Sequence, residues 1–231
     1  MVASTRLRPP SDKPARSPAP AGILLTGFDP FGGEPVNPSW LLAHALHGRR
    51  VGGHRIRAVQ LPTVFGQALT VLRAEVRAHR PALVVCLGLA AGRAAMSLER
   101  VAINVDDARI ADNAGAQPVD EPVIAGAPAA YFSTLPIKAM QAAMRAEGVP
   151  AEVSQTAGTF VCNHVFFGLM HLLATERTLK HARGGFVHVP MLPEQGAPHL
   201  SLDDMVRGLR AGIRAALATP TDARLGAGAL H

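Results

Sequence analysis

Short apolar runs alternate with longer segments of helical periodicity along most of the chain, and this alternation restricts the folds open to it. The run Leu83–Leu87 contains no polar residue, as is typical of a strand buried on both faces. The segment Val64–His79 instead repeats its apolar residues every three to four positions, as an amphipathic helix does. Strands that alternate with helices usually form a parallel sheet covered on both faces. We therefore predict an α/β protein: a three-layer α/β/α sandwich with a mostly parallel central sheet.

The expected strands are Ile23–Thr26, Ile56–Leu61, Leu83–Leu87, Val101–Val105, Ala151–Ser154 and Gly185–Val189. One expected helix begins at Pro38 with Asn37 as its N-cap, and the others are Val64–His79, Ile137–Glu147, Cys162–Glu176 and Leu202–Leu217. No linker divides these segments, so we expect a single domain over residues 21–220. A disordered, proline-rich extension over residues 1–20 precedes it, and a flexible tail over residues 221–231 follows.

Composition argues against several classes of function. The formal charge is +6, but the first 20 residues carry +3 of it, and the rest of the chain has no basic cluster. Such a balance is typical of a solvated surface, so no nucleic-acid partner is expected. No apolar run approaches the ~18 residues of a membrane span, and the N-terminus lacks a secretory apolar region. We expect a cytoplasmic protein with no membrane partner, and no cofactor or metal, because His, Asp and Glu show no ligand spacing.

The two cysteines have different surroundings. Cys86 lies within an apolar run and is predicted to be a buried small side chain. Cys162 follows a short strand and a turn of small residues, at or near the start of a helix. There the helix dipole and free N–H groups can lower a thiol pKa that is ~8.5 in solution, and can bind an oxyanion. Cys162 is therefore a candidate nucleophile, the alternative being a buried residue beside a tight turn.

His188 ends an apolar strand, where its side chain can reach the carboxyl edge at which open α/β sheets bind ligands. A cysteine and a histidine at successive strand ends form the nucleophile and base of thiol hydrolases. His164 is a rival base, but its position on the helix after Cys162 favours a packing role. A third residue must orient the imidazole, and spacing alone leaves four candidates: Glu99, Asp106, Asp107 and Asp112.

A glycine-rich loop, Gly27–Gly33, follows the first expected strand but matches no phosphate-loop motif. It carries Phe28 and Phe31, which either pack into the core or form two walls of an apolar pocket. A non-enzymatic alternative for the whole chain is a binding module that holds an anion on this loop.

Four segments, in this order, resemble the pyroglutamyl-peptidase I (pyrrolidone-carboxylate peptidase) family over about residues 22–217. The first is Thr26–Gly33 with Asn37-Pro38-Ser39, and the second is Glu99–Asn104 with Asp107-Ala108-Arg109. The third is Thr156–Asn163, and the fourth is His188-Val189-Pro190. The resemblance implies a single α/β/α domain, frequent tetramers, and removal of an N-terminal pyroglutamyl (5-oxoproline) residue from peptides by a Cys-His-Glu triad.

By the resemblance, Cys162 attacks the carbonyl, His188 transfers the proton, and Glu99 orients His188. It also implies the residues around the substrate ring: Phe28, Phe31, Asn37, Arg109, Ile110, Phe160 and Val161. Two residues depart from the family pattern, because Leu89 stands at a common Gln and Gln155 at a common Asn. The alternative enzyme is a thiol amidase of the same fold acting on another small acyl group.

Overall fold

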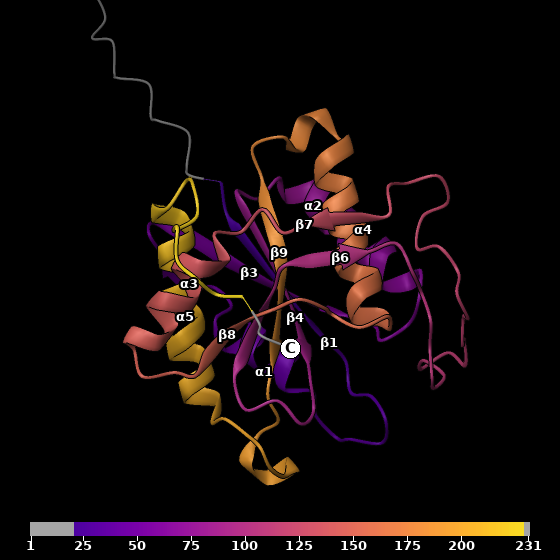
Figure 1. Cartoon of the computed structure of the whole chain (residues 1–231), viewed down its shortest axis with the longest axis horizontal. Coiled ribbons are helices and arrows are strands. Elements are labelled where there is room, and N and C mark those ends of the chain that lie inside the picture. The colour runs from indigo at the N-terminus through magenta and orange to yellow at the C-terminus, as the bar shows by residue number, and fades with distance from the viewer. Residues whose placement is uncertain (1–20, 229–231) are drawn as a thin grey trace, which may run out of the picture.

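A seven-stranded sheet forms the centre of the molecule (Figure 1). The computed structural model describes residues 21–228, so the expected extension over residues 1–20 lies outside the described part. The sheet order is β2 (Arg50–Val51), β3 (His54–Leu61), β1 (Ile23–Phe28), β4 (Leu83–Leu89), β9 (Arg183–Val189), β5 (Met96–Glu99) and β8 (Ala151–Ser154). Strands β3, β1, β4 and β9 are parallel, whereas β5 is antiparallel to β9 and parallel to β8.

Helices cover both faces of the sheet, as the alternation predicts (Figure 1). Helices α1 (Pro38–Ala45), α3 (Ile137–Ala146) and α5 (Leu202–Ala218) lie on one face, and α2 (Gln67–His79) and α4 (Val161–Thr175) on the other. Alternate residues of each strand enter the two cores: in β4, Val85 packs with the first group and Val84 with the second. Each such fully buried side chain contributes about 1.5–3 kcal/mol. The predicted three-layer sandwich is confirmed.

Helix boundaries follow from local chemistry. Asn37 caps α1 by accepting the backbone N–H of Ser39 at 3.1 Å, with Pro38 at the first helical position, as predicted. Helix α2 begins at Gln67 rather than Val64, because Gly66 adopts a left-handed φ of 71°. No helix in residues 21–228 is long and apolar enough to cross a membrane.

The segment after α5 forms no helix or strand over residues 221–228. At its start, Asp222 accepts the backbone N–H groups of Lys138 (3.1 Å) and Ala139 (3.0 Å). These are orphan donors of the first turn of α3, where Pro136 provides no side-chain cap. The expected tail is therefore attached to the domain at Asp222.

Two strand predictions need correction. The segment Met96–Glu99 was not expected as a strand, because four residues with alternating polarity give a weak pattern, yet it is β5 of the central sheet. The expected strand Val101–Val105 is shorter, β6 (Val101–Ile103), and pairs with β7 (Ala130–Phe132) in a separate two-stranded ribbon. Glu99 therefore ends one strand of the sheet instead of standing at the entrance of another.

Candidate active site

Cys162 is the second residue of α4 and is partly exposed. Phe160 occupies the N-cap position in an extended conformation, and no side chain caps this helix start within the described residues. The first backbone N–H groups of an α-helix have no acceptor within the helix. The start of α4 thus combines a thiol with unpaired donors, which is the arrangement that an oxyanion requires.

Gly88 on β4 places the Cys162 sulfur next to His188. A Cβ atom at position 88 would stand 2.8 Å from Cys162 Sγ, so the sulfur lies directly over this strand. Gly88 is paired in register with His188 on the neighbouring strand β9. The nucleophile and base predicted from the sequence are therefore neighbours on the same face of the sheet.

Glu99 holds the imidazole of His188 from the opposite side. His188 Nδ1 lies 2.8 Å from Glu99 Oε1, and Arg93 Nη1 donates to the same oxygen at 2.8 Å. Glu99 is completely buried, and its Oε2 has no hydrogen-bond partner among the described residues. A carboxylate at Nδ1 keeps the proton there and leaves Nε2 free to accept one.

The pKa of Cys162 is raised, whereas its place at the start of the helix predicts that it is lowered. Burial of the sulfur raises the pKa to about 12, the charge of Glu99 adds to this, and Arg93 opposes it. The expected lowering by the helix dipole is therefore wrong as a net effect, because desolvation of the thiolate dominates. The resting thiol is protonated near neutral pH. A reaction through this thiol would therefore require a base to remove its proton.

Cys86 matches its predicted structural role. It is completely buried on β4, and burial raises the pKa of its thiol to about 12, with the neighbouring Thr26 acting in the opposite direction. A buried, protonated thiol is chemically inert.

A cavity of about 150 Å³ opens beside Cys162. This is smaller than the usual ~300–1,000 Å³ of ligand pockets, so only a small group fits. The rings of Phe31 and Phe160 lie 5.3 Å apart, and Phe65 stands edge-on to Phe160. The lining residues are Phe28, Phe31, Glu34, Val36, Asn37, Thr63, Leu89, Phe160, Val161 and Cys162.

Five of the seven residues expected around the substrate ring line this cavity, and two do not. Arg109 and Ile110 are exposed and are absent from its lining, so their role stays a prediction. Their segment lies close by: Thr159 donates to the Asp107 carbonyl at 2.7 Å, and Asn113 to the Pro30 carbonyl at 2.9 Å. These contacts attach it to the two loops that carry Phe160 and Phe31.

Sequence reasoning did not find Glu34, Val36 and Thr63 as lining residues. Val36 and Thr63 carry no chemical signal of their own, and Glu34 looks like an ordinary surface acid. Glu34 is held at the cavity by Gln195, whose Nε2 donates to its Oε2 at 3.0 Å. Gln195 belongs to the 3₁₀ helix η2 (Pro193–Gln195), so this contact depends on folding of the segment after β9.

The rival acids and base have other partners. His164 Nδ1 lies 2.7 Å from Asp106 Oδ2, and its Nε2 accepts the backbone N–H of Gly66 at 3.0 Å. Asp112 accepts backbone N–H groups, including that of Phe65 at 2.9 Å. Asp107 is exposed. Of the four candidate acids, the structure brings Glu99 to His188.

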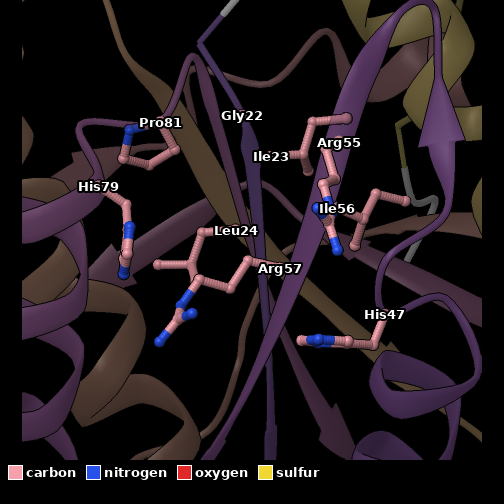
Figure 2. A pocket seen from close by; sticks show the side chains of 9 residues that line it. All are labelled: Gly22, Ile23, Leu24, His47, Arg55, Ile56, Arg57, His79 and Pro81. Carbon is pink, nitrogen blue, oxygen red and sulfur yellow. The ribbon is translucent and has the colours of Figure 1, made fainter.

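A second cavity, of about 390 Å³, lies at the amino ends of β1 and β3, and Figure 2 shows its basic side chains. Two of them, Arg57 and His79, pair with Glu75 at 2.8 and 3.3 Å. None of Cys162, His188 and Glu99 lines this cavity. Within residues 21–228, no group of three His, Cys, Asp or Glu residues is arranged to hold a metal ion.

Known proteins resemble this chain in sequence and in fold. The sequence model described as pyroglutamyl peptidase matches residues 21–219. A pyrrolidone-carboxylate peptidase of Cupriavidus necator is 60% identical over 90% of this chain and 99% of its own length, and one of Cupriavidus taiwanensis is 59% identical over the same shares. The crystal structure of Bacillus amyloliquefaciens pyroglutamyl peptidase I is 49% identical. It matches with a TM-score of 0.85 over 88% of this chain and 100% of that one.

Proposed function

The chain belongs to the pyroglutamyl peptidase family, and on this premise we propose that Cys162 is its nucleophile, His188 its general base and Glu99 the residue that orients His188. It is a cysteine peptidase that removes N-terminal pyroglutamate from peptides. The alternatives of a thiol amidase for another acyl group and of an anion-binding module lack this support. One set of neighbours supports the residue assignment. The Cys162 sulfur lies over Gly88, Gly88 is paired with His188 on the next strand, and His188 Nδ1 contacts Glu99.

The first half of the reaction forms an acyl-enzyme. His188 Nε2 takes the thiol proton while Cys162 Sγ bonds to the carbonyl carbon, because a thiol with a pKa of about 12 holds its proton until a base removes it. The carbonyl oxygen becomes an oxyanion, and the uncapped N–H groups at the start of α4 stabilise it. The C–N bond then breaks, and His188 gives its proton to the leaving amine. A thioester between Cys162 and the pyroglutamyl group remains.

The second half releases the acyl group. A water molecule attacks the thioester carbon while His188 accepts one of its protons, and the C–S bond breaks as Cys162 Sγ takes that proton back. Free pyroglutamate leaves, and the thiol is restored. Glu99 stabilises the positive charge that His188 carries in both halves.

The cavity chemistry supports the substrate assignment. Pyroglutamate is a neutral lactam, so its cyclised nitrogen carries no positive charge. Phe28, Phe31 and Phe160 surround a small apolar space that admits such a ring. An ordinary N-terminus would bring a charged ammonium into this space, at a desolvation cost of several kcal/mol.

We also propose that the chain assembles into a homo-tetramer, as the family resemblance implies, and acts in the cytoplasm. Two large apolar side chains are exposed in consecutive segments of the chain: Val119 is 65% exposed in the loop between β6 and β7, and Phe132 on β7 is 70% exposed. Contiguous exposed apolar surface marks protein–protein contacts, so we propose that this loop and β7 contribute to the subunit interface. Both cysteines are free, and a free nucleophilic thiol requires reducing surroundings. Light scattering of the wild type and of Phe132→Asp tests the assembly, and cell fractionation tests the location.

Turnover of a pyroglutamyl amide tests the triad. Cys162→Ala and His188→Ala should each lower kcat by ~10⁴–10⁶, and Glu99→Gln by ~10³–10⁴. Asp107→Asn is the matched control, because the spacing of residues also allows Asp107 to orient His188, yet its side chain is exposed in the structure. A kcat of Cys162→Ala near that of the wild type would contradict the role of Cys162. A decrease in kcat of Asp107→Asn equal to that of Glu99→Gln would contradict the assignment of Glu99.

A further inference from the structure

Arg93 is a charged residue at the active site to which the mechanism above assigns no role. It lies in the connection between β4 and β5, and only 29% of its side chain is exposed. Its Nη1 donates to Glu99 Oε1 at 2.8 Å, and its Nη2 donates to the Thr156 carbonyl at 3.2 Å. Thr156 belongs to the loop that runs from β8 to Cys162. One guanidinium thus joins the acid of the proposed triad to the loop that precedes the helix of Cys162.

We infer that Arg93 is a positioning residue for the reaction, which compensates the charge of Glu99, keeps Glu99 aligned with His188 and fixes the loop before Cys162 relative to that pair. The inference rests on the proposed triad. Arg93 does not touch the reacting atoms in this account. It acts through Glu99 on one side and through Thr156 on the other.

The electrostatic part of the argument follows from burial. A completely buried carboxylate is expensive unless a cation or several hydrogen bonds compensate it. Glu99 Oε2 has no partner among the described residues, and both contacts of the carboxylate are at Oε1: the imidazole of His188 and the guanidinium of Arg93. Of these two groups, Arg93 carries the permanent positive charge and therefore compensates the carboxylate. Its charge also opposes the effect of Glu99 on the pKa of Cys162.

The geometric part follows from the shape of the guanidinium. Two nitrogens of one rigid, planar group reach Glu99 and Thr156, so the two acceptors cannot move independently. The Thr156 carbonyl also accepts the hydroxyl of Ser154 at 3.1 Å, which fixes the end of β8 to the same point. A lysine keeps the charge but has no planar fork with which to hold both acceptors in this way.

The test compares Arg93→Gln, Arg93→Lys and the control Arg100→Gln in steady-state turnover of a pyroglutamyl amide. Arg100 is a suitable control because it directly follows Glu99, yet its Nε donates to Gln155 at 2.9 Å and, in the described part of the chain, its side chain has no hydrogen bond to the Glu99 carboxylate. We expect Arg93→Gln to lower kcat by about 10- to 100-fold with little change in KM, as removal of an orienting partner does. Arg93→Lys should recover part of the loss, and Arg100→Gln should stay within about twofold of wild type.

A double-mutant cycle with Glu99→Gln separates a role through Glu99 from a general structural role. If Arg93 acts mainly through Glu99, Arg93→Gln should lower the kcat of Glu99→Gln by much less than it lowers that of the wild type. If Arg93→Gln reduces the yield of folded protein, the same cycle is run with Arg93→Lys, and melting temperatures are measured for every variant.

Two results would overturn the inference. One is a kcat of Arg93→Gln equal to that of Arg100→Gln. The other is a double variant whose fold-loss in kcat equals the product of the losses in Arg93→Gln and Glu99→Gln, because the two residues would then act independently. Failure of the triad itself is distinguishable, because in that case Glu99→Gln alone would keep the kcat of the wild type.

Discussion

Gly88 lies directly beneath Cys162, so close that a single methyl group at position 88 would stand 2.8 Å from the sulfur. The same methyl group would meet Phe186 Cζ at 2.8 Å. Gly88 has an ordinary negative φ within β4, so its value here is its lack of a side chain and not its backbone freedom. The absence of a Cβ is what allows the Cys162 sulfur to approach the strand next to His188.

Gly88→Ala should therefore displace the thiol and lower kcat by ~10² or more, since a misplacement of about 1 Å has this effect on an aligned reaction. Steady-state kinetics on a pyroglutamyl amide measures the loss. Gly226→Ala is the matched control, because a Cβ there meets nothing within 4 Å and the φ is not positive. Equal activity of the two variants would contradict the close approach of Cys162 to β4.

The buried Cys86 thiol predicts a particular loss of stability at alkaline pH. Burial raises its pKa from 9.0 to about 12, so above pH 9 the unfolded chain loses this proton while the native chain keeps it. The free energy of unfolding must then fall by about 1.4 kcal/mol per pH unit from this group alone, between about pH 9 and 12. Cys86→Ala removes the effect. The difference in free energy of unfolding between wild type and Cys86→Ala should narrow by roughly 1 kcal/mol between pH 7 and pH 10.

Urea unfolding in a reductant measures this difference, and kcat at pH 7.5 should stay close to wild type. A gap between the two proteins that is the same at pH 7 and pH 10 would show that Cys86 titrates normally in the native state.

The small apolar cavity predicts specificity for the cyclised residue. A pyroglutamyl amide should be cleaved at least ~10³-fold more efficiently than matched amides beginning with free Gln or Glu, which carry an ammonium group into the cavity. A prolyl amide keeps the ring but has a cationic nitrogen and no lactam carbonyl, so it should also be a poor substrate. The comparison uses kcat/KM for the four amides at pH 7.5 with a reductant, which keeps the thiol active.

Glu34 makes this prediction sharper, because it is the one acid among the residues that line the cavity. If a free ammonium does enter, Glu34 is its natural partner, and Glu34→Gln should then suppress prolyl cleavage more than pyroglutamyl cleavage. Efficient cleavage of the Gln amide by the wild type would mean that the cavity does not select a lactam.

His164 and His188 should respond in opposite ways to replacement. His164→Leu leaves Asp106, which is 6% exposed, as a buried carboxylate without its partner, at a cost of about 3–5 kcal/mol. His188→Leu should instead abolish turnover. Chemical unfolding and steady-state kinetics of both variants measure the two effects.

The second replacement Asp106→Asn should restore part of the stability lost in His164→Leu, since it removes the uncompensated charge. A His164→Leu enzyme that folds at 20 °C should keep kcat within about tenfold of wild type, because this imidazole lies against Phe65 and not at the nucleophile. Loss of turnover at full stability would identify His164 as the base.

Local sequence chemistry determined most of the secondary structure and two members of the site. The apolar run around Cys86 specified a buried strand, and Asn37 with Pro38 specified where α1 begins, because both signals act within a few residues. The turn of small residues before Cys162 likewise placed the thiol at a helix start. The position of His188 at a strand end followed from the same alternation of segments.

Apart from the family resemblance, only the tertiary structure distinguished which acid contacts His188. Glu99 and His188 are 89 residues apart, and they meet because β5 enters the sheet antiparallel to β9, which no local pattern encodes. Spacing along the chain left Asp106, Asp107 and Asp112 equally available. The pKa of Cys162 was likewise undetermined by sequence, because desolvation depends on how the whole site is packed and here exceeds the local effect of the helix start. Interactions between residues close in the chain can be recognised from the sequence, whereas strand pairing and burial depend on contacts that exist only once the chain has folded.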